Sequence, residues 1–492
     1  MTSKALDNVA KLRDIVNVRD FGASPTASAT VNTAAIQAAI DYVYGLMGGG
    51  AVQIIGDYNI NGALVIGSLV RLQGPGRLVQ TASNTPIIKV TKSTFNQGWS
   101  IRQLELRYQS AQPSTNTDAR AIILCEANKF SYSFIVEDVR IWQAAKGIDA
   151  PEETASFAFL GTFNNVVIEQ CSDWGFDWRN AITGGSTYLS MNNVWVNNIA
   201  GQEIAGSKGF RIRGCATLCI NGIAADHVQD QPFYFDACVG NIGVLTAESC
   251  DLTKSSGGAE LVNISGGSLT IGEIALESNN ITISGTAFGA GLRVTDAAYV
   301  RVGILRDNFN AVNDTSSDDY FTIAAATNAS AVYVDKYIYS PNTSPPAGFA
   351  TAPNGAIADF NAPPKLRLFR ENVRTDVRGG RTHIFGTSPP ASGTWAKGDI
   401  TWNNDPIDAT SPIGWICLVA GTPGTWLEFG APIITQATAA AIAAVGNAIN
   451  TTGKFGGKLV WDSTNNRLLR TQGGAAADPW YVVDGSASVT PS

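Results

Sequence analysis

The chain has 492 residues, among them 50 Gly and 20 Pro, and only 15% of its residues are charged while 45% are hydrophobic. This composition excludes a disordered chain and a coiled coil. The formal net charge is −7, from 34 Lys and Arg against 41 Asp and Glu, and no basic run occurs. Because clustered cations that neutralise phosphates are lacking, no nucleic acid is expected as a partner.

The sequence has no membrane, export or metal motif. No stretch approaches the ~18 apolar residues of a membrane span, and the start MTSKALDNVAKLRD has no apolar core, so we expect neither membrane insertion nor an ordinary signal peptide. Two His and seven Cys without a CxxC spacing predict free thiols made in a reducing compartment, with no metal and no cofactor.

The pattern changes period near residue 46. Apolar residues in NTAAIQAAIDYVYG recur at helical spacing, which predicts a helix over 32–45. It follows the segment VNVRDFGA at 16–23. Beyond it, GGGAVQIIGDYNINGALVIG alternates short apolar runs with Gly and Asn turns, which is typical of strands.

The middle of the chain repeats itself. DVRIWQ (138–143) is followed by NVVIEQ (165–170), NVWVNN (193–198) and GIAADH (222–227), at offsets of 27, 28 and 29 residues. IGVLTAES (242–249) and IGEIALES (271–278) continue the series. Recurrence of one short unit indicates a solenoid. In each copy the first and third apolar residues, such as Val194 and Val196, are expected in the core and the residue after them outside.

Residues 16–76 resemble the opening of the pectate-lyase-like superfamily of right-handed parallel β-helix proteins. The likeness rests on VNVRDFGA, then AIQAAID, then a GG turn and the first strands. Together with the repeats, this resemblance implies an all-β fold: a right-handed parallel β-helix over residues 16–340, in which the helix at 32–45 caps the first coil.

The remaining segments form smaller parts. Residues 1–15 are expected to be an N-terminal attachment segment, and the Pro- and Gly-rich stretch 341–364 a linker. Residues 365–430 contain GDITWNN and GWICLVAGTPGTW, which resemble small β modules that follow the β-helix in bacteriophage tail proteins. An Ala-rich helical connector is expected over 431–453, where the spacing of Ile442, Val445 and Ile449 suits packing of parallel copies. A terminal β segment follows over 454–492.

Stacked coils place one outward residue of each repeat in a column. The predicted column contains Trp142, Glu169, Asn197, Asp226, Glu248 and Glu277. Glycoside hydrolysis uses two carboxyl groups, ~5–5.5 Å apart for retention and ~6.5–9.5 Å for inversion. Because neighbouring strands lie ~4.8 Å apart, acids on adjacent or alternate coils bracket both distances. We therefore predict Asp226, Glu248 and Glu277 as catalytic, with Glu169 and Asp236 as reserves.

Other outward polar and aromatic residues suit sugar binding, since hydroxyls need polar partners and sugar CH faces stack on rings. The predicted substrate-binding residues are Trp142, Asn197, His227, Arg211, Arg213, Tyr234 and Arg293. Trp174, Trp178 and Trp195 are either sugar platforms or core and interface residues. A merely solvated face is the alternative interpretation of the acidic column.

Known enzyme motifs of the wider fold are missing. Of the polygalacturonase-like segments only RIR (211–213) echoes the RIK motif, GHG is absent, and no WIDH-type segment of pectate lyases occurs. Plain pectin is therefore not an expected substrate. The layout instead resembles the phage tailspike and capsule-depolymerase group, whose members are usually parallel homotrimers.

The resemblance to tailspikes implies a virion tail protein made in the host cytoplasm. Its expected partners are two further copies of the chain, a tail hub or adaptor, and a bacterial capsule or lipopolysaccharide, which it would depolymerise by glycoside hydrolysis. Cleavage by β-elimination stays open. The main alternative is a receptor-binding or structural tail protein that adheres to the glycan without cleaving it. A cellular polysaccharide-degrading enzyme is disfavoured by the tail-type C-terminal segments.

Overall fold

The computed structural model divides the chain into two compact units, Met1–Asn372 and Val373–Ser492. The attachment segment expected over 1–15 lies outside the described residues except for Ile15, as does much of the linker expected over 341–364, and the predicted part boundaries stay predictions. The structure describes residues 15–492 without 47, 154–155, 180–187, 297, 317–319, 326–329, 341, 348–349, 352–356, 360–366, 371–373, 379–380, 392–394, 404–411 and 431–433.

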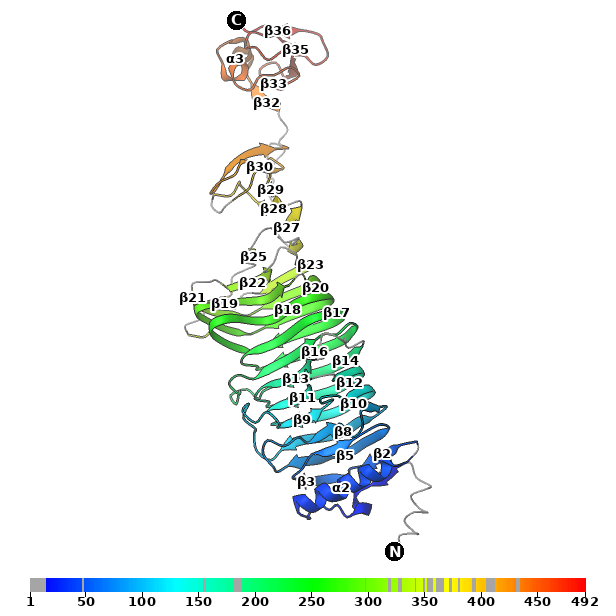
Figure 1. Ribbon diagram of the computed structural model, residues 1–492. Helices are drawn as coiled ribbons and strands as arrows, with labels where there is room; N and C mark the ends of the chain where they lie inside the picture. Colours follow the sequence, from blue (N-terminus) through cyan, green and yellow to red (C-terminus); the bar gives the residue numbers. More distant parts are fainter. Residues whose placement is uncertain are drawn as a thin grey trace. The chain divides into compact units, whose positions relative to one another are not determined.

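A helix closes the first coil of the larger unit. After β1 (Ile15–Asn17) and the short 3-10 helix η1 (Val18–Phe21), helix α2 spans Ala29–Tyr44. The Ser28 side chain caps it by accepting a hydrogen bond from the Val31 amide. Its buried side, including Ile36 and Ile40, packs on the end of the hydrophobic core (Figure 1). The apolar core is thereby shielded from water where the stack of coils begins.

Most of the larger unit is built from two parallel ladders of stacked strands (Figure 1). The first ladder consists of β2 (Gly50–Gln53), β5 (Val70–Gln80), β8 (Ser100–Tyr108), β10 (Phe130–Trp142), β12 (Phe157–Glu169), β14 (Leu189–Asn197), β16 (Leu218–Asp226), β17 (Gln231–Glu248), β18 (Asp251–Glu277), β20 (Tyr299–Asn308), β23 (Ala331–Ser340) and β26 (Arg367–Arg370).

The second ladder runs along another side of the coils. It consists of β4 (Leu64–Ile66), β6 (Ile88–Val90), β9 (Arg120–Ile123), β11 (Lys146–Ala150), β13 (Trp174–Arg179), β15 (Lys208–Arg213), further parts of β17 and β18, then β19 (Asn280–Thr295), β22 (Tyr320–Ala325) and β25 (Ile357–Asp359). Shorter strands extend the coils: β3 (Gly56–Ile60), β7 (Phe95–Gln97), β21 (Ala311–Ser316) and β24 (Ala350–Thr351).

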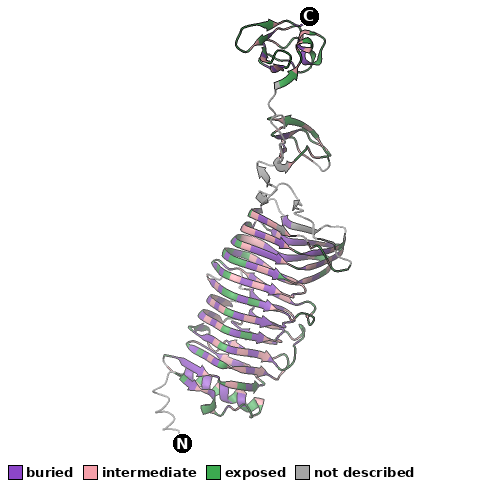
Figure 2. Cartoon of the chain, turned by 180° about the vertical axis from the view of Figure 1, so that it is seen from behind, coloured by how far each residue is buried: buried purple, intermediate pink, exposed green. Residues whose placement is uncertain are grey.

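These parallel ladders confirm the predicted fold class, an all-β parallel β-helix. Along most described strands of the first ladder buried residues alternate with more exposed ones, as Figure 2 shows. Val194 and Val196 of β14 are buried, whereas Trp195 between them is 38% exposed. The inward residues of successive coils stack into one continuous apolar core. The predicted core residues of the repeats are therefore confirmed, whereas Glu169, expected on the surface, is only 9% exposed.

A sharp bend follows several strands of the first ladder at the same place. The residues at this bend adopt a left-handed backbone in most coils, with φ between 52° and 65°, although none is glycine: Gln143, Gln170, His227, Ser249, Ser278 and Phe309. A left-handed conformation costs a residue with a side chain about 1–2 kcal/mol. Stacking of the flanking strands compensates for this cost and turns the chain from the first ladder into the second.

The smaller unit contains two groups of strands. The first group has β27 (Arg374–Arg378), β28 (Arg381–Gly386), β29 (Ile400–Asn403), β30 (Gly414–Val419) and β31 (Thr425–Phe429). The second is a separate sheet with two short helices: β32 (Ile434–Ala437), α3 (Ala439–Ala443), α4 (Ala448–Thr451), β33 (Leu459–Asp462), β34 (Arg467–Thr471), β35 (Trp480–Val482) and β36 (Ser488–Val489).

The Ala-rich segment does not present an apolar stripe to other copies. Ile442 and Ile449 are buried in the core of their own module, together with Val460, Leu469 and Trp480. The expectation that their spacing packs parallel copies is wrong, because α3 and α4 are too short to form a seam and fold back on the terminal sheet. This segment therefore provides no argument for a trimer.

Candidate functional site

The outward column predicted from the repeats lies in continuous register along the first ladder. Trp142 pairs with Glu169, Glu169 with Asn197, and Asn197 with Asp226. Asp226 then pairs with Glu248, and Glu248 with Glu277. Each of these residues directly precedes the bend or ends its strand, so the fold presents them on one side of the coils, one per coil.

A hollow opens beside the middle of this column. Two residues earlier on each strand, a second outward column contains Trp195, Ala224, Thr246 and Ala275 in register. Small side chains follow the large Trp195, which leaves a hollow of about 380 Å³. Its lining includes Asn192, Asn193, Trp195, Asn221, Ala224, Val244 and Thr246.

The first two residues of the column, Trp142 and Glu169, already contact arginine side chains. Arg140 forms an ion pair with Glu169, and the hydrogen bond from this pairing raises the pKa of the Arg140 guanidinium. The guanidinium groups of Arg140 and Arg107 lie 4.6 and 5.2 Å from the centre of the Trp142 ring. Glu169 therefore has an arginine partner, and Trp142 already makes two cation–π contacts.

The three acids further along have no described arginine partner of this kind, although Asp226 contacts His227. In the part of the chain that the structure describes, no Lys or Arg lies within ion-pair distance of Asp226, Glu248 or Glu277. Partial desolvation raises the pKa of Glu248 although this residue is exposed, the charges of Asp226 and Glu277 on the adjacent coils raise it further, and His227 opposes the shift. The resulting upward direction favours the protonated carboxyl group, which a general acid requires.

Neighbouring polar groups hold the two flanking acids. Nδ1 of His227 lies 2.6 Å from Oδ1 of Asp226. Burial raises the pKa of Asp226, although His227 counteracts the shift. Asn308 Nδ2 donates a hydrogen bond of 3.3 Å to Glu277 Oε1. The predicted residues Asp226, Glu248, Glu277, Asn197 and His227 therefore lie on consecutive coils. None of them lines the hollow, which lies earlier along β14, β16 and β17.

The other predicted residues lie on the second ladder, where they form ion pairs. Arg211 donates to both oxygens of Asp177, at 2.7 and 2.6 Å. Arg213 pairs with Asp236 at 2.7 Å and also with Glu152. The remaining two predicted residues here are Arg293, which pairs with Glu260, and Tyr234, whose pKa is raised by burial and then by the charge of Asp236. None of these residues joins the acids of the first ladder.

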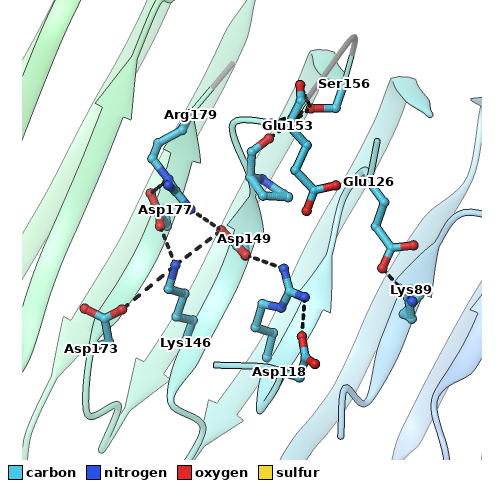
Figure 3. Close-up of polar contacts among 12 residues, drawn as sticks. Lys89, Asp118, Glu126, Lys146, Asp149, Glu153, Ser156, Asp173, Asp177 and Arg179 are labelled. Atoms are coloured by element: carbon cyan, nitrogen blue, oxygen red, sulfur yellow. Dashed lines mark hydrogen bonds and ion pairs between the residues drawn. The ribbon is translucent and has the colours of Figure 1, made fainter. Parts of the chain in front are cut away.

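Two buried carboxylates at the centre of this charged cluster were not predicted as a pair (Figure 3). Asp149 and Asp177 are register partners, and each is only 1% exposed. Lys146 and Arg179 contact both of them, and Arg120 donates to Asp149 at 2.9 Å. Such multiple pairing offsets the loss of hydration that burial imposes on two anions. Their position indicates a structural role, because the cations cover both carboxylates.

The three tryptophans Trp174, Trp178 and Trp195 lie in different environments. Trp178 is fully buried in the core, and Trp174 is 5% exposed beneath Arg211, whose guanidinium lies 4.7 Å from its ring centre. Trp195 alone of the three is open to the hollow. The small residues Ala224 and Thr246, which create that hollow, carry no chemistry that sequence reasoning would select.

Two further observations concern the described residues. Among them, no group of three or more His, Cys, Asp or Glu side chains is arranged to hold a metal ion. No helix in that part of the chain combines the length and hydropathy that a bilayer span requires.

Comparisons with known proteins give structural likeness only. No protein-family model and no curated protein matches the chain. A tailspike of Acinetobacter phage vb_AbaP_AS12 (gp42) has 10% identity over 96% of this chain and 78% of its own, with a TM-score of 0.45. The A-module of the Azotobacter vinelandii mannuronan C-5 epimerase AlgE4 has 14% identity over 66% and 94%, with a TM-score of 0.35. The Streptococcus pneumoniae adhesin PfbA has 11% identity over 70% and 99%, with a TM-score of 0.31. Likeness at this level assigns no function.

Proposed function

We propose that this protein is a phage tailspike that binds a bacterial surface polysaccharide along the first ladder and hydrolyses it. The observation that carries the proposal is the run of Asp226, Glu248 and Glu277 on three successive coils near the hollow at Trp195, with no Lys or Arg partner among the described residues. Like charges in register destabilise a sheet. Their presence at an open hollow therefore favours a chemical role over a structural one.

The acids take different roles in the proposed reaction. Glu248, whose pKa is raised, donates its proton to the glycosidic oxygen as general acid. Glu277 attacks the anomeric carbon, so that a bond to the sugar forms as the bond to the departing oxygen breaks. A water that has lost its proton to Glu248 then releases the sugar. The ~4.8 Å between adjacent strands supports this retaining scheme, which needs carboxyl groups ~5–5.5 Å apart.

Asp226 and His227 assist from the preceding coil. The charge of Asp226 contributes to the raised pKa of Glu248, and His227 lies against Asp226. Asn197, on the coil before Asp226, offers an amide to sugar hydroxyls. Glu169 and Trp142 are held by Arg140 and lie outside the reacting group.

Location in a phage tail and assembly as a homotrimer belong to the same proposal. They rest on the resemblance of GDITWNN and GWICLVAGTPGTW to modules of phage tail proteins. A hub or adaptor of the tail would hold the chain. Light scattering of the purified protein should give three times the 51.8 kDa chain mass, and a monomer would contradict the trimer.

The test of function is to incubate the protein with capsules and lipopolysaccharides of candidate hosts. Product size, reducing ends and absorbance near 235 nm are followed. Shorter chains with new reducing ends and no absorbance support hydrolysis. Rising absorbance would instead indicate β-elimination, and binding without shortening would indicate an adhesin.

A further inference from the structure

We call the hollow at Trp195 and the adjoining acids Asp226, Glu248 and Glu277 the groove. Its carboxylates differ from others on the first ladder in their ion-pair partners. Elsewhere on this ladder, several outward carboxylates pair with arginines on neighbouring coils, whereas the exposed Asp138 accepts a hydrogen bond from Asn165. Glu105 pairs with Arg77 at 2.9 Å, and Glu273 pairs with Arg306 at 2.9 Å. Glu169 and Arg140 form a third such pair. Among the described residues, no Lys or Arg forms an ion pair with any of the three acids: the nearby Arg306, in register with Ala275, is held by Glu273, and Asp226 contacts His227.

The charge of these three acids, of which Asp226 contacts the basic side chain of His227, determines which ligands bind along them. The acids on three adjacent coils already repel one another across about 4.8 Å per coil. An anionic ligand would add a further repulsion that water screens only partly in a hollow. Sugars without charge pay no such penalty, and their hydroxyls can donate hydrogen bonds to carboxylate oxygens.

The hollow also offers a free aromatic face. No aromatic ring and no cation stacks on Trp195 within the described part of the chain, in contrast to Trp142. Asn193 and Asn221 line the same hollow and offer both donors and acceptors. A ring face next to amides suits the CH face and the hydroxyls of a pyranose.

We propose that the glycan segment bound over Trp195 and the acids from Asp226 to Glu277 carries no carboxylate, sulfate or phosphate. This inference rests on the proposed function of the groove and specifies its substrate class. Acidic groups of a bacterial polysaccharide would have to lie outside this segment or be absent.

The experiment compares matched polymers on the full-length protein. Acidic bacterial capsules are tested in their native form and after carboxyl reduction, which replaces each carboxylate by a hydroxyl. Neutral lipopolysaccharides are included. Dissociation constants are measured at low temperature with immobilised polymer for the wild type, for Trp195→Ala, and for the combined Asp226→Asn, Glu248→Gln and Glu277→Gln variant. Asp57→Asn, at an exposed position of β3, is the control.

Carboxyl-reduced polymers should bind the wild type at least about tenfold more tightly than the native polymers do. The combined variant should lose this preference, whereas Asp57→Asn should keep it. Added NaCl should strengthen wild-type binding of the native acidic polymers and leave the reduced ones unchanged, a readout that needs no variant. Equal or tighter binding of native acidic polymers, weakened by Trp195→Ala, would overturn the charge inference while the groove stands. Binding that neither Trp195→Ala nor the combined variant affects would overturn the proposed groove itself.

Discussion

Arg211 on β15 holds Asp177 on the preceding coil by two hydrogen bonds of 2.7 and 2.6 Å. The carboxylate also contacts Lys146 and Arg179. Three cations thus surround one buried anion. Removal of the anion leaves their charges uncompensated, which costs more than the ion pairs themselves contribute.

The first prediction is that Asp177→Asn destabilises the β-helix by about 3–5 kcal/mol at pH 7. Urea unfolding followed by circular dichroism measures the loss. Asp20→Asn, at an exposed position in the same unit, is the control and should change stability little. A loss below about 1 kcal/mol would contradict the structural role of the pair.

The same variant should have a pH-dependent effect. Burial alone would raise the pKa of Asp177, but Arg211, Lys146 and Arg179 outweigh it and the pKa is lowered below 3.8. The carboxylate therefore contributes stability above pH 3.8, and this contribution is lost as the pH falls through the lowered pKa. The stability difference between wild type and Asp177→Asn should shrink below pH 3.8. A constant difference from pH 7 to pH 2 would be inconsistent with ionisation as its cause.

The next prediction concerns the general acid. Glu248→Gln should lower the rate of depolymerisation about 10²–10⁴-fold, because an amide cannot donate the proton, while binding persists. Reducing-end release measures the rate. Glu273→Gln, four residues before Glu277 on the same strand, is the matched control and should retain activity. Unchanged cleavage by Glu248→Gln would remove Glu248 from the mechanism.

A pH profile tests how the acids interact. Glu248 must be protonated to act, so activity falls as the pH rises above its pKa. Asp226→Asn removes one of the charges that raise this pKa after burial. The alkaline side of the profile should therefore move to lower pH in Asp226→Asn. An unmoved alkaline side would show that Asp226 does not act on Glu248.

The final prediction is that the C-terminal module can be destabilised without loss of activity in the groove. Asn450 is 1% exposed, accepts a hydrogen bond of 2.7 Å from Trp480 Nε1 and donates one of 2.8 Å to the Ile442 carbonyl. Asn450→Ala leaves these groups unpaired, at about 1–3 kcal/mol. Limited proteolysis should then cut the module faster, while soluble oligosaccharide cleavage continues at the wild-type rate. Equal loss of cleavage would indicate that the module takes part in the reaction.

The repeats predicted the register of the first ladder because each coil carries the same alternation before the same bend. Asn197, Asp226 and Glu248 could therefore be aligned without any coordinates. The partners of Asp177 could not, because loops of varying length separate the strands of the second ladder and no motif links Arg211 or Lys146 to it. The apolar spacing of Ile442 and Ile449 misled for a related reason: spacing alone does not specify whether the partner surface lies in the same chain.

The spacing between groove residues on adjacent strands does not depend on the number of residues in each coil. Asp226 and Glu248 are 22 residues apart and Glu248 and Glu277 are 29 apart, yet each pair lies on directly adjacent strands. Extra residues are absorbed elsewhere in the coil. Insertions on the far side can therefore change the outline of the protein while every groove residue keeps its neighbours, so that shape and sugar specificity can vary independently.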